Sequence, residues 1–160
     1  MGIIVSSAIE SKIAGVIVVP LKQIEDERGA VLHMLRSDSP NFSKFGEIYF
    51  SVVNPGTIKA WKRHRAMAQH FAVPLGRIRL AFFDDRADSP SKGQIEEVIL
   101  GRPDRYYLIC IPPMIWYGFK GISEMPALLA NCSDMPHDPT ESEQLAVSND
   151  YISYDWGEDD

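Results

Sequence analysis

The sequence predicts an all-β domain built as an antiparallel sandwich or barrel. Short apolar segments follow one another along the chain, many of them at spacings of roughly 8–12 residues, a pattern typical of such folds. Turn-forming sequences separate the segments, and most of the eleven prolines and eleven glycines lie in these separators. No internal repeat or long linker divides the chain.

Each expected strand is an apolar run between two turn signals. In chain order the runs are 15–21, 30–35, 47–53, 57–61, 70–75, 77–83, 95–100, 106–111 and 127–131. The clearest separators are 37–41, 54–56, 84–93, 101–104 and 111–114. Only segments 11–15 and 38–46 are expected to form short helices. Segment 151–156 alternates well enough to be a final strand or a docked arm.

Length and composition indicate one globular domain over residues 1–160. The chain is 45% hydrophobic and 24% charged, with a formal net charge of −6. A general nucleic-acid binder needs a basic face, so the acidic balance argues against nucleic acid as a partner, although a local basic pocket for a small anion is compatible with it. We expect an N-terminal arm over about 1–22 and a flexible tail over about 157–160.

The cysteines and the hydropathy pattern bear on the compartment. Cys110 and Cys132 lie in apolar surroundings and have no CxxC spacing, which favours buried, reduced thiols in a cytoplasmic protein. No apolar run approaches the ~20 residues that a membrane-spanning helix needs. We therefore expect no membrane association.

The stretch "GTIKAWKRHRAMAQHFAVPLG" carries the first specific motif. Gly56 is followed after five residues by Lys62, Arg63 and His64, then after four by Gln69 and after six by Gly76. This spacing resembles the first signature of the cupin superfamily, a small jelly-roll barrel, in which His-x-His, Glu and Gly stand at these places. "PPMIWY" resembles the second signature, with Pro112 and Met114 at its proline and glycine positions.

The residues at the metal positions of this motif do not suit a metal. The four positions hold Lys62, His64, Gln69 and Tyr117. A protonated lysine repels a divalent cation, and glutamine is a weak neutral ligand, so one good ligand is left. We expect no metal and no other cofactor.

Strand alternation places these side chains. With a period of two, Lys62 and His64 share one face with Ile58 and Ala60. The opposite face then holds Lys59, Trp61, Arg63 and Arg65, whose cations are expected on a solvated surface or at a diphosphate. A lysine and a histidine side by side in an apolar barrel disfavour each other's charged forms. Such a pair can act as acid and base near neutral pH or hold an anion.

Five ordered segments resemble the dTDP-4-dehydrorhamnose 3,5-epimerases and their relatives that act on nucleotide-linked 4-keto sugars. They are "DERGAVLH", "GTIKAWKRH", "AFFDDRADSPSKGQ", "IPPMIWYGF" and "DMPHDP". The resemblance extends from about residue 20 to 140. It implies a nucleotide-linked sugar, dTDP-linked in the family, as the ligand.

The resemblance also implies roles for individual positions. Arg28 stands where the family arginine meets the nucleotide phosphates, and Lys59 replaces a substrate-facing arginine. Lys62 stands at the position of the histidine base, Gln69 at that of the enolate lysine and Asn131 at that of the proton-returning tyrosine. His33 replaces a glutamate, His137 falls near an aromatic position, and Tyr117 replaces the histidine of the second signature. Much of the family's catalytic set is thus exchanged while the scaffold motifs remain.

The chemistry common to this group is removal of a proton next to a carbonyl, which needs a base within about 3 Å and a donor for the enolate oxygen. His64 could be the base, with Lys62 as the donor and Tyr117 as the returning acid; Lys62 as the base is the inverse assignment. The first interpretation is an epimerase. A 3,4-ketoisomerase is second, because His64, Arg65 and Gln69 also match that relative's pattern. A catalytically silent sugar-nucleotide binder is the third.

Two further expectations concern packing and assembly. The aromatic residues Tyr49, Trp61, Trp116 and Phe119 are expected in the core or at a subunit interface. The segment "IAGVIVVPL" shows little polar alternation, which suits a strand covered on both faces. Together with the resemblance, this predicts a homodimer that exchanges an N-terminal strand.

Overall fold

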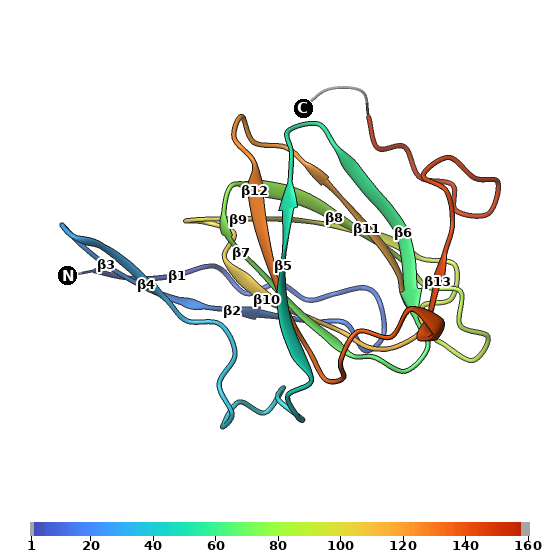
Figure 1. The fold of residues 1–160 in the computed structure, drawn as a ribbon, viewed down its shortest axis with the longest axis horizontal. Coiled ribbons are helices and arrows are strands. Elements are labelled where there is room, and N and C mark those ends of the chain that lie inside the picture. The colour runs from blue at the N-terminus through green and yellow to red at the C-terminus, as the bar shows by residue number, and fades with distance from the viewer. Residues whose placement is uncertain (1, 158–160) are drawn as a thin grey trace.

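A computed structural model describes residues 2–157, and these residues form an all-β barrel with a projecting N-terminal sheet (Figure 1). One five-stranded sheet has the order β2-β10-β7-β12-β5 and the facing five-stranded sheet has the order β13-β6-β11-β8-β9. The all-β prediction is confirmed. The strands of the first sheet are β2 (Ile17–Pro20), β5 (Glu47–Val53), β7 (Gln69–Leu75), β10 (Tyr107–Ile111) and β12 (Ala127–Ser133). Those of the second are β6 (Ile58–His64), β8 (Arg77–Phe83), β9 (Ile95–Gly101), β11 (Trp116–Gly121) and β13 (Ser142–Gln144).

The N-terminal arm forms a third sheet, which extends away from the barrel (Figure 1). It contains β1 (Gly2–Val5), β3 (Lys22–Asp26) and β4 (Gly29–Leu32) in the order β1-β3-β4. Strands β3 and β4 form a tight hairpin. The expected strand 15–21 divides at Pro20, so that β2 belongs to the barrel while β3 belongs to the arm.

The two helices expected from the sequence do not form. Residues 11–15 are held by side chains instead, since the Ser11 hydroxyl and the Lys12 amide both donate to the Glu96 carboxylate at 2.5 and 2.6 Å. The first part of residues 38–46 makes turns and the rest is irregular, because so short a segment gains too few helical hydrogen bonds to offset helix nucleation. Within the described residues the helical structure is one 3-10 turn, η1 (Pro139–Glu141).

The C-terminal segment is a docked arm and not a regular strand. Residues 151–156 pack on the outer face of the second sheet, where Tyr154 and Trp156 contact Trp61 at ring-centroid distances of 5.9 and 5.3 Å. Trp61 and Trp116 are buried in this outer cluster, as expected of core residues. Residues 158–160 of the expected tail lie outside the described part of the chain.

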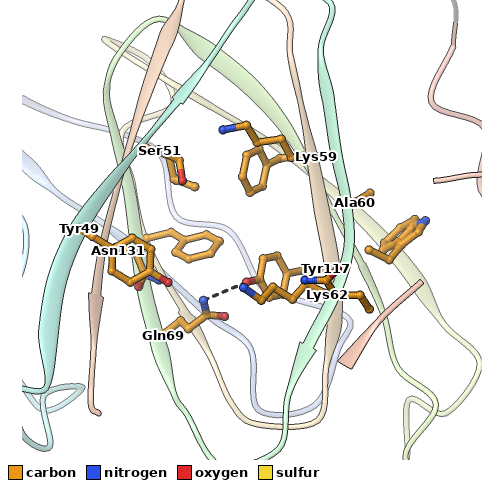
Figure 2. Close-up of a pocket in the computed structure, with 13 residues that line it drawn as sticks. Tyr49, Ser51, Lys59, Ala60, Lys62, Gln69, Tyr117 and Asn131 are labelled. Atoms are coloured by element: carbon orange, nitrogen blue, oxygen red, sulfur yellow. Dashed lines mark hydrogen bonds between the residues drawn. The ribbon is translucent and has the colours of Figure 1, made fainter. Parts of the chain in front are cut away.

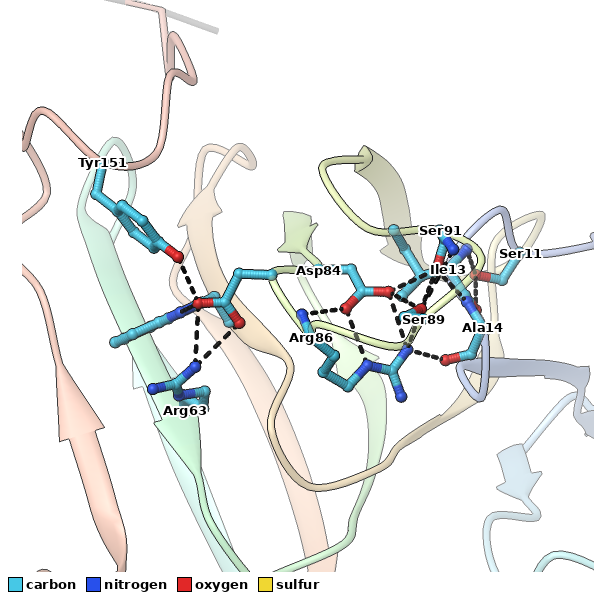
Figure 3. A network of polar contacts seen from close by, with 11 residues as sticks. Ser11, Ile13, Ala14, Arg63, Asp84, Arg86, Ser89, Ser91 and Tyr151 are labelled. Atoms are coloured by element: carbon cyan, nitrogen blue, oxygen red, sulfur yellow. Dashed lines mark hydrogen bonds and ion pairs between the residues drawn. The ribbon is translucent and has the colours of Figure 1, made fainter.

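A network of polar contacts around Asp84 stabilises the long turn between β8 and β9 (Figure 3). Asp84 is fully buried and accepts hydrogen bonds from Arg86, Ser89 and Ser91. Burial raises the pKa of the Asp84 carboxyl, but these hydrogen bonds outweigh burial and keep that pKa well below its ordinary value. Arg86 also donates to the Ala14 carbonyl at 2.5 Å, which ties the N-terminal arm to the barrel.

Arg63 belongs to a second polar cluster, so its expected place on a solvated face is wrong. Its side chain is only 15% exposed. It donates to Asp85 at 3.0 Å and lies over the Trp116 ring at 4.6 Å. Tyr151 donates to the same Asp85 carboxylate at 2.7 Å, which attaches the C-terminal segment (Figure 3).

Strand β6 contains a bulge that changes which side chains face the interior. Tyr117 of β11 pairs with Lys62, but Phe119, two residues further along, pairs with Lys59, three residues back. The extra residue in β6 reverses the alternation. Lys59 and Lys62 therefore line the same cavity, and the expected placement of Lys59 on the face opposite Lys62 is wrong.

The two glycines that frame the first motif allow a matched test of packing in the barrel. Gly56 and Gly76 both adopt left-handed backbone, with φ of 74° and 72°. A Cβ at Gly56 would meet nothing within 4 Å, whereas one at Gly76 would lie 2.5 Å from the Ala127 Cα. We expect Gly56→Ala to cost about 1 kcal/mol through the backbone alone. Gly76→Ala should cost about 1–3 kcal/mol more, because the neighbouring backbone must move.

Urea unfolding of the two variants measures this difference. Equal losses of stability would contradict the close approach of β12 to the Gly76 turn.

Candidate functional site

A cavity of about 330 Å³ lies between the two sheets (Figure 2). One wall comes from β5, β7 and β12 and the other from β6, β11 and β13. Its lining mixes amide, phenol and ammonium groups with apolar surface, as in sites that orient a small polar ligand. The lining residues are Tyr49, Ser51, Lys59, Ala60, Trp61, Lys62, Gln69, Phe71, Tyr117, Phe119, Leu129, Asn131 and Gln144.

A chain of hydrogen bonds extends from the cavity wall into the protein. Tyr117 lines the cavity, and its hydroxyl lies 3.2 Å from His64 Nε2. His64 is buried and does not line the cavity itself, and its Nδ1 hydrogen-bonds the Glu141 carboxylate. The other Glu141 oxygen accepts from the backbone amides of Ala66 and Met67 at 3.2 and 3.3 Å. His64 can therefore reach a ligand only through Tyr117.

Within this series of hydrogen bonds, His64 is a neutral imidazole and Glu141 is an ionised carboxylate. Burial lowers the pKa of His64, and the hydrogen bond to Glu141 opposes burial without reversing the direction. For Glu141, burial raises the pKa, but the hydrogen bonds from His64 and the Ala66 amide outweigh it and the net pKa is lowered. At neutral pH the pair is therefore neutral histidine with ionised glutamate.

This charge state decides which groups donate. A carboxylate only accepts, so the His64 proton lies on Nδ1 and Nε2 is left as an acceptor for the Tyr117 hydroxyl. Gln69 Nε2 donates to the same hydroxyl oxygen at 3.1 Å (Figure 2). One lone pair of the Tyr117 oxygen is left for the cavity. Burial raises the pKa of Tyr117 strongly, which keeps the phenol protonated.

The lysines supply positive charge to the cavity. Lys62 lies directly across the strand pair from Tyr117. Lys59 is exposed, and its ammonium donates to the Val52 carbonyl at 2.9 Å. The three residues predicted to be catalytic, His64, Lys62 and Tyr117, are thus close together, with only the last two on the cavity surface.

Opposite Tyr117, the wall from β5 and β12 carries Tyr49 and Asn131 (Figure 2). Asn131 Nδ2 donates to the Tyr49 hydroxyl at 2.9 Å. The interpretation of Tyr49 as a core or interface residue is wrong, since it lines the cavity. The sequence alone pointed the other way, because the alternating Ile48, Phe50 and Val52 would normally face the core. In the structure these three side chains are exposed, and Tyr49 and Ser51 turn inward.

Of the residues predicted to bind substrate, Lys59, Gln69 and Asn131 line the cavity, and three others do not. Arg28 lies in the β3–β4 turn, largely exposed and paired with Asp26 at 2.5 Å. His33 follows β4, and its carbonyl accepts from Tyr106 at 2.8 Å. His137 is exposed in the loop after β12, where its amide donates to Glu47 at 2.9 Å.

Sequence reasoning also missed Glu141 and Gln144. Glu141 lies 77 residues from His64, and no spacing in the sequence connects them. Gln144 reaches the cavity because β13 pairs with β6, which brings it opposite Lys62.

Neither the cupin metal positions nor the rest of residues 2–157 form a metal site. Both ring nitrogens of His64 are already hydrogen-bonded. Over the described chain, no group of three or more His, Cys, Asp or Glu side chains could hold a metal ion. In the same residues no helix has the length and apolarity to cross a membrane.

Comparison with known proteins shows which proteins this chain resembles. The crystal structure of a dTDP sugar isomerase from Desulfovibrio desulfuricans G20 is 51% identical and superposes with a TM-score of 0.90, covering 93% of this chain and 95% of that one. The probable low-salt glycan biosynthesis epimerase Agl13 of Haloferax volcanii is 34% identical over 135 residues, 82% of this chain and 86% of Agl13. The spore coat polysaccharide biosynthesis protein SpsL of Bacillus subtilis is 27% identical over 146 residues, 90% of this chain and 96% of SpsL.

The family described as dTDP-4-dehydrorhamnose 3,5-epimerase matches residues 10–160. The barrel is the cupin-type jelly roll predicted from the two signatures. The chain belongs to the dTDP-4-dehydrorhamnose 3,5-epimerase family.

Proposed function

We propose that this protein is an epimerase of a nucleotide-linked 4-keto-6-deoxy sugar, dTDP-linked, and that it removes a proton from the carbon next to the ketone. The observation that carries this proposal is the Tyr117–His64–Glu141 chain, which ends at the cavity beside Lys62. The family and the dTDP sugar isomerase at 51% identity support the choice of substrate class.

The base is the Tyr117–His64 pair acting together. The cavity-facing lone pair of the Tyr117 oxygen takes the substrate proton while the phenol passes its own proton to His64 Nε2. The electrons of the broken C–H bond move into the enolate, whose oxygen is stabilised by the Lys62 ammonium. Glu141 stabilises the imidazolium that forms. This proposal differs from both assignments left open by the sequence: His64 takes the proton through Tyr117 instead of directly, and Tyr117 belongs to the base instead of being the returning acid, because His64 lies behind Tyr117.

The assembly that we propose is a homodimer. The open edge strand β5 exposes Ile48, Phe50 and Val52, and the projecting sheet exposes Ile3, Val5 and Val31. Apolar surface of this kind is typical of an interface. Arg28, at the tip of the projecting hairpin, would then meet the nucleotide phosphates at the cavity of the partner subunit. The free, buried thiols of Cys110 and Cys132 suit a reducing compartment, and we propose the cytoplasm.

Deuterium incorporation tests the proposed reaction. The protein is incubated with dTDP-4-keto-6-deoxyglucose in deuterated water, and the reaction is followed by proton NMR. We expect deuterium at C3 or C5 and formation of an epimer. Tyr117→Phe should lower the rate about 10²- to 10⁴-fold because the proton path to His64 is broken.

Tyr151→Phe, which removes an exposed phenol on the outer face, is the control and should keep the wild-type rate. A product with the keto group moved to C3 would indicate a ketoisomerase. Binding measured by calorimetry without any exchange would indicate a silent binder.

The pH profile tests the charge state of His64. Because neutral His64 is required and burial lowers its pKa, the acid limb of kcat/KM should lie below pH 6.5, the ordinary histidine value. Activity is lost as the pH falls through the His64 pKa. Glu141 raises that pKa, so Glu141→Gln should move the limb to still lower pH and also reduce the plateau rate, since loss of an orienting carboxylate can cost up to about 10⁴-fold.

Glu143→Gln is the matched control. Glu143 lies two residues from Glu141 on the same segment, but it pairs with Arg63 and does not contact His64. An acid limb above pH 6.5, or equal profiles for the two variants, would contradict this role of Glu141.

Replacement of one apolar residue on β5 tests the dimer. Light scattering should give twice 18.0 kDa for the wild type. Phe50→Glu should shift the equilibrium to monomer because it buries a charge in the interface. Met125→Glu, which changes an exposed side chain in the β11–β12 loop, should leave the mass unchanged. A monomeric wild type would reject the dimer.

A further inference from the structure

The wall opposite Tyr117 carries a second phenol with its own polar support. Tyr49 projects into the cavity from β5, in the sheet that faces β11 (Figure 2). Its hydroxyl oxygen accepts from Asn131 Nδ2 at 2.9 Å. The proposed reaction, as described so far, gives this pair no role.

The hydrogen-bonding around Tyr49 differs from that around Tyr117. The Tyr117 proton is engaged with His64, so the Tyr117 oxygen offers a lone pair to the cavity. The Tyr49 oxygen accepts a hydrogen bond from Asn131 Nδ2, so its own O–H remains to act as a donor. The two phenols therefore offer opposite functions, an acceptor on one wall and a donor on the other.

Asn131 adds a second observation that indicates a ligand. Its side chain is 3% exposed, and its Oδ1 is a buried acceptor with no hydrogen-bond partner in the described chain. An unsatisfied buried acceptor costs roughly 1–3 kcal/mol. A sugar hydroxyl placed beside Tyr49 would satisfy it.

We propose that Tyr49 is the catalytic acid that returns a proton to the substrate from the face opposite Tyr117, with Asn131 positioning both the phenol and a sugar hydroxyl. The inference rests on the proposed function. In this step the Tyr49 O–H bond breaks and its proton bonds the carbon that was deprotonated. The enolate electrons form the new C–H bond, and the carbonyl is restored. The Tyr49 phenolate left behind accepts a hydrogen bond from Asn131 until it takes a proton from solvent, and the extra proton of His64 is released to solvent, which restores both groups.

Other groups are less suitable as this acid. An amide such as Asn131 does not release a proton at neutral pH. Lys59 belongs to β6, on the same wall as Tyr117, and its ammonium is hydrogen-bonded to the Val52 carbonyl. Removal from one face and return to the other inverts the carbon, which is the outcome that an epimerase requires. The side-chain amide of Asn131 stands where the family resemblance placed a tyrosine, and Tyr49 restores a phenol there from the neighbouring strand β5.

The experiment separates deprotonation from inversion. Wild type, Tyr49→Phe and Tyr117→Phe are incubated with dTDP-4-keto-6-deoxyglucose in deuterated water, and deuterium in the recovered substrate is measured apart from epimer formed. Tyr49→Phe should keep deuterium incorporation within an order of magnitude of wild type, because Tyr117 and His64 still remove and return the proton on one face. Epimer formation should fall about 10²- to 10⁴-fold. Tyr117→Phe should lose both.

The possible outcomes decide between the two proposals. Epimer formation by Tyr49→Phe at the wild-type rate overturns the inference. Loss of both signals by Tyr49→Phe, with dTDP still bound in calorimetry, also overturns it, because Tyr49 would then serve deprotonation. A wild type that incorporates no deuterium rejects the proposed function and the inference with it. Tyr151→Phe is again the control that removes a phenol outside the cavity.

Discussion

The contact between Glu141 and His64 joins the C-terminal segment to the barrel, and the geometry of the cavity depends on it. Glu141 ends the 3-10 turn that leads into β13, and β13 closes the open edge of β6. The same carboxylate caps the backbone amides of Ala66 and Met67 in the turn after β6. A single buried anion thus fixes the histidine tautomer, the end of β6 and the start of β13. Because the contact is buried and hydrogen-bonded on both oxygens, loss of either partner would leave a buried group unsatisfied.

The architecture could be predicted from the sequence because its signals are local. Apolar runs, turn residues and the spacing from Gly56 to Gly76 act within a few residues, and they located the barrel strands other than β11 and β13 together with the cavity-facing Lys62, Gln69 and Tyr117. The bulge in β6 has no such signal, because one extra residue in a ladder is visible only in the pairing with β11. The prediction therefore failed at Lys59, just beyond the point where the alternation reverses.

Contacts between residues far apart in the sequence could not be predicted from it either. Glu141 meets His64 across 77 residues and Tyr49 meets Asn131 across 82, and neither pair can be recognised from spacing. The alternation along β5 favoured the wrong face, since Ile48, Phe50 and Val52 would normally face the core but are exposed in the structure. The side of β5 with Tyr49 and Ser51 faces the cavity.

The exchanged residues make physical sense as a set and not as separate losses. The resemblance puts the family's histidine base at position 62, whereas the histidine of this chain, His64, stands two positions further along β6, buried behind the cavity wall. A phenol at 117 extends its reach by one hydrogen bond, and the amide at Gln69 orients that phenol. Lys62 stands at the position that the resemblance gives to the histidine, and in the proposed reaction it supplies positive charge where negative charge develops during enolisation. In the proposed reaction these residues together supply a base, a proton path and a stabilising cation in one cavity. The same reasoning extends to the facing wall: once position 131 is an amide, an acid must come from another strand, and β5 presents the Tyr49 phenol within hydrogen-bond distance of that amide.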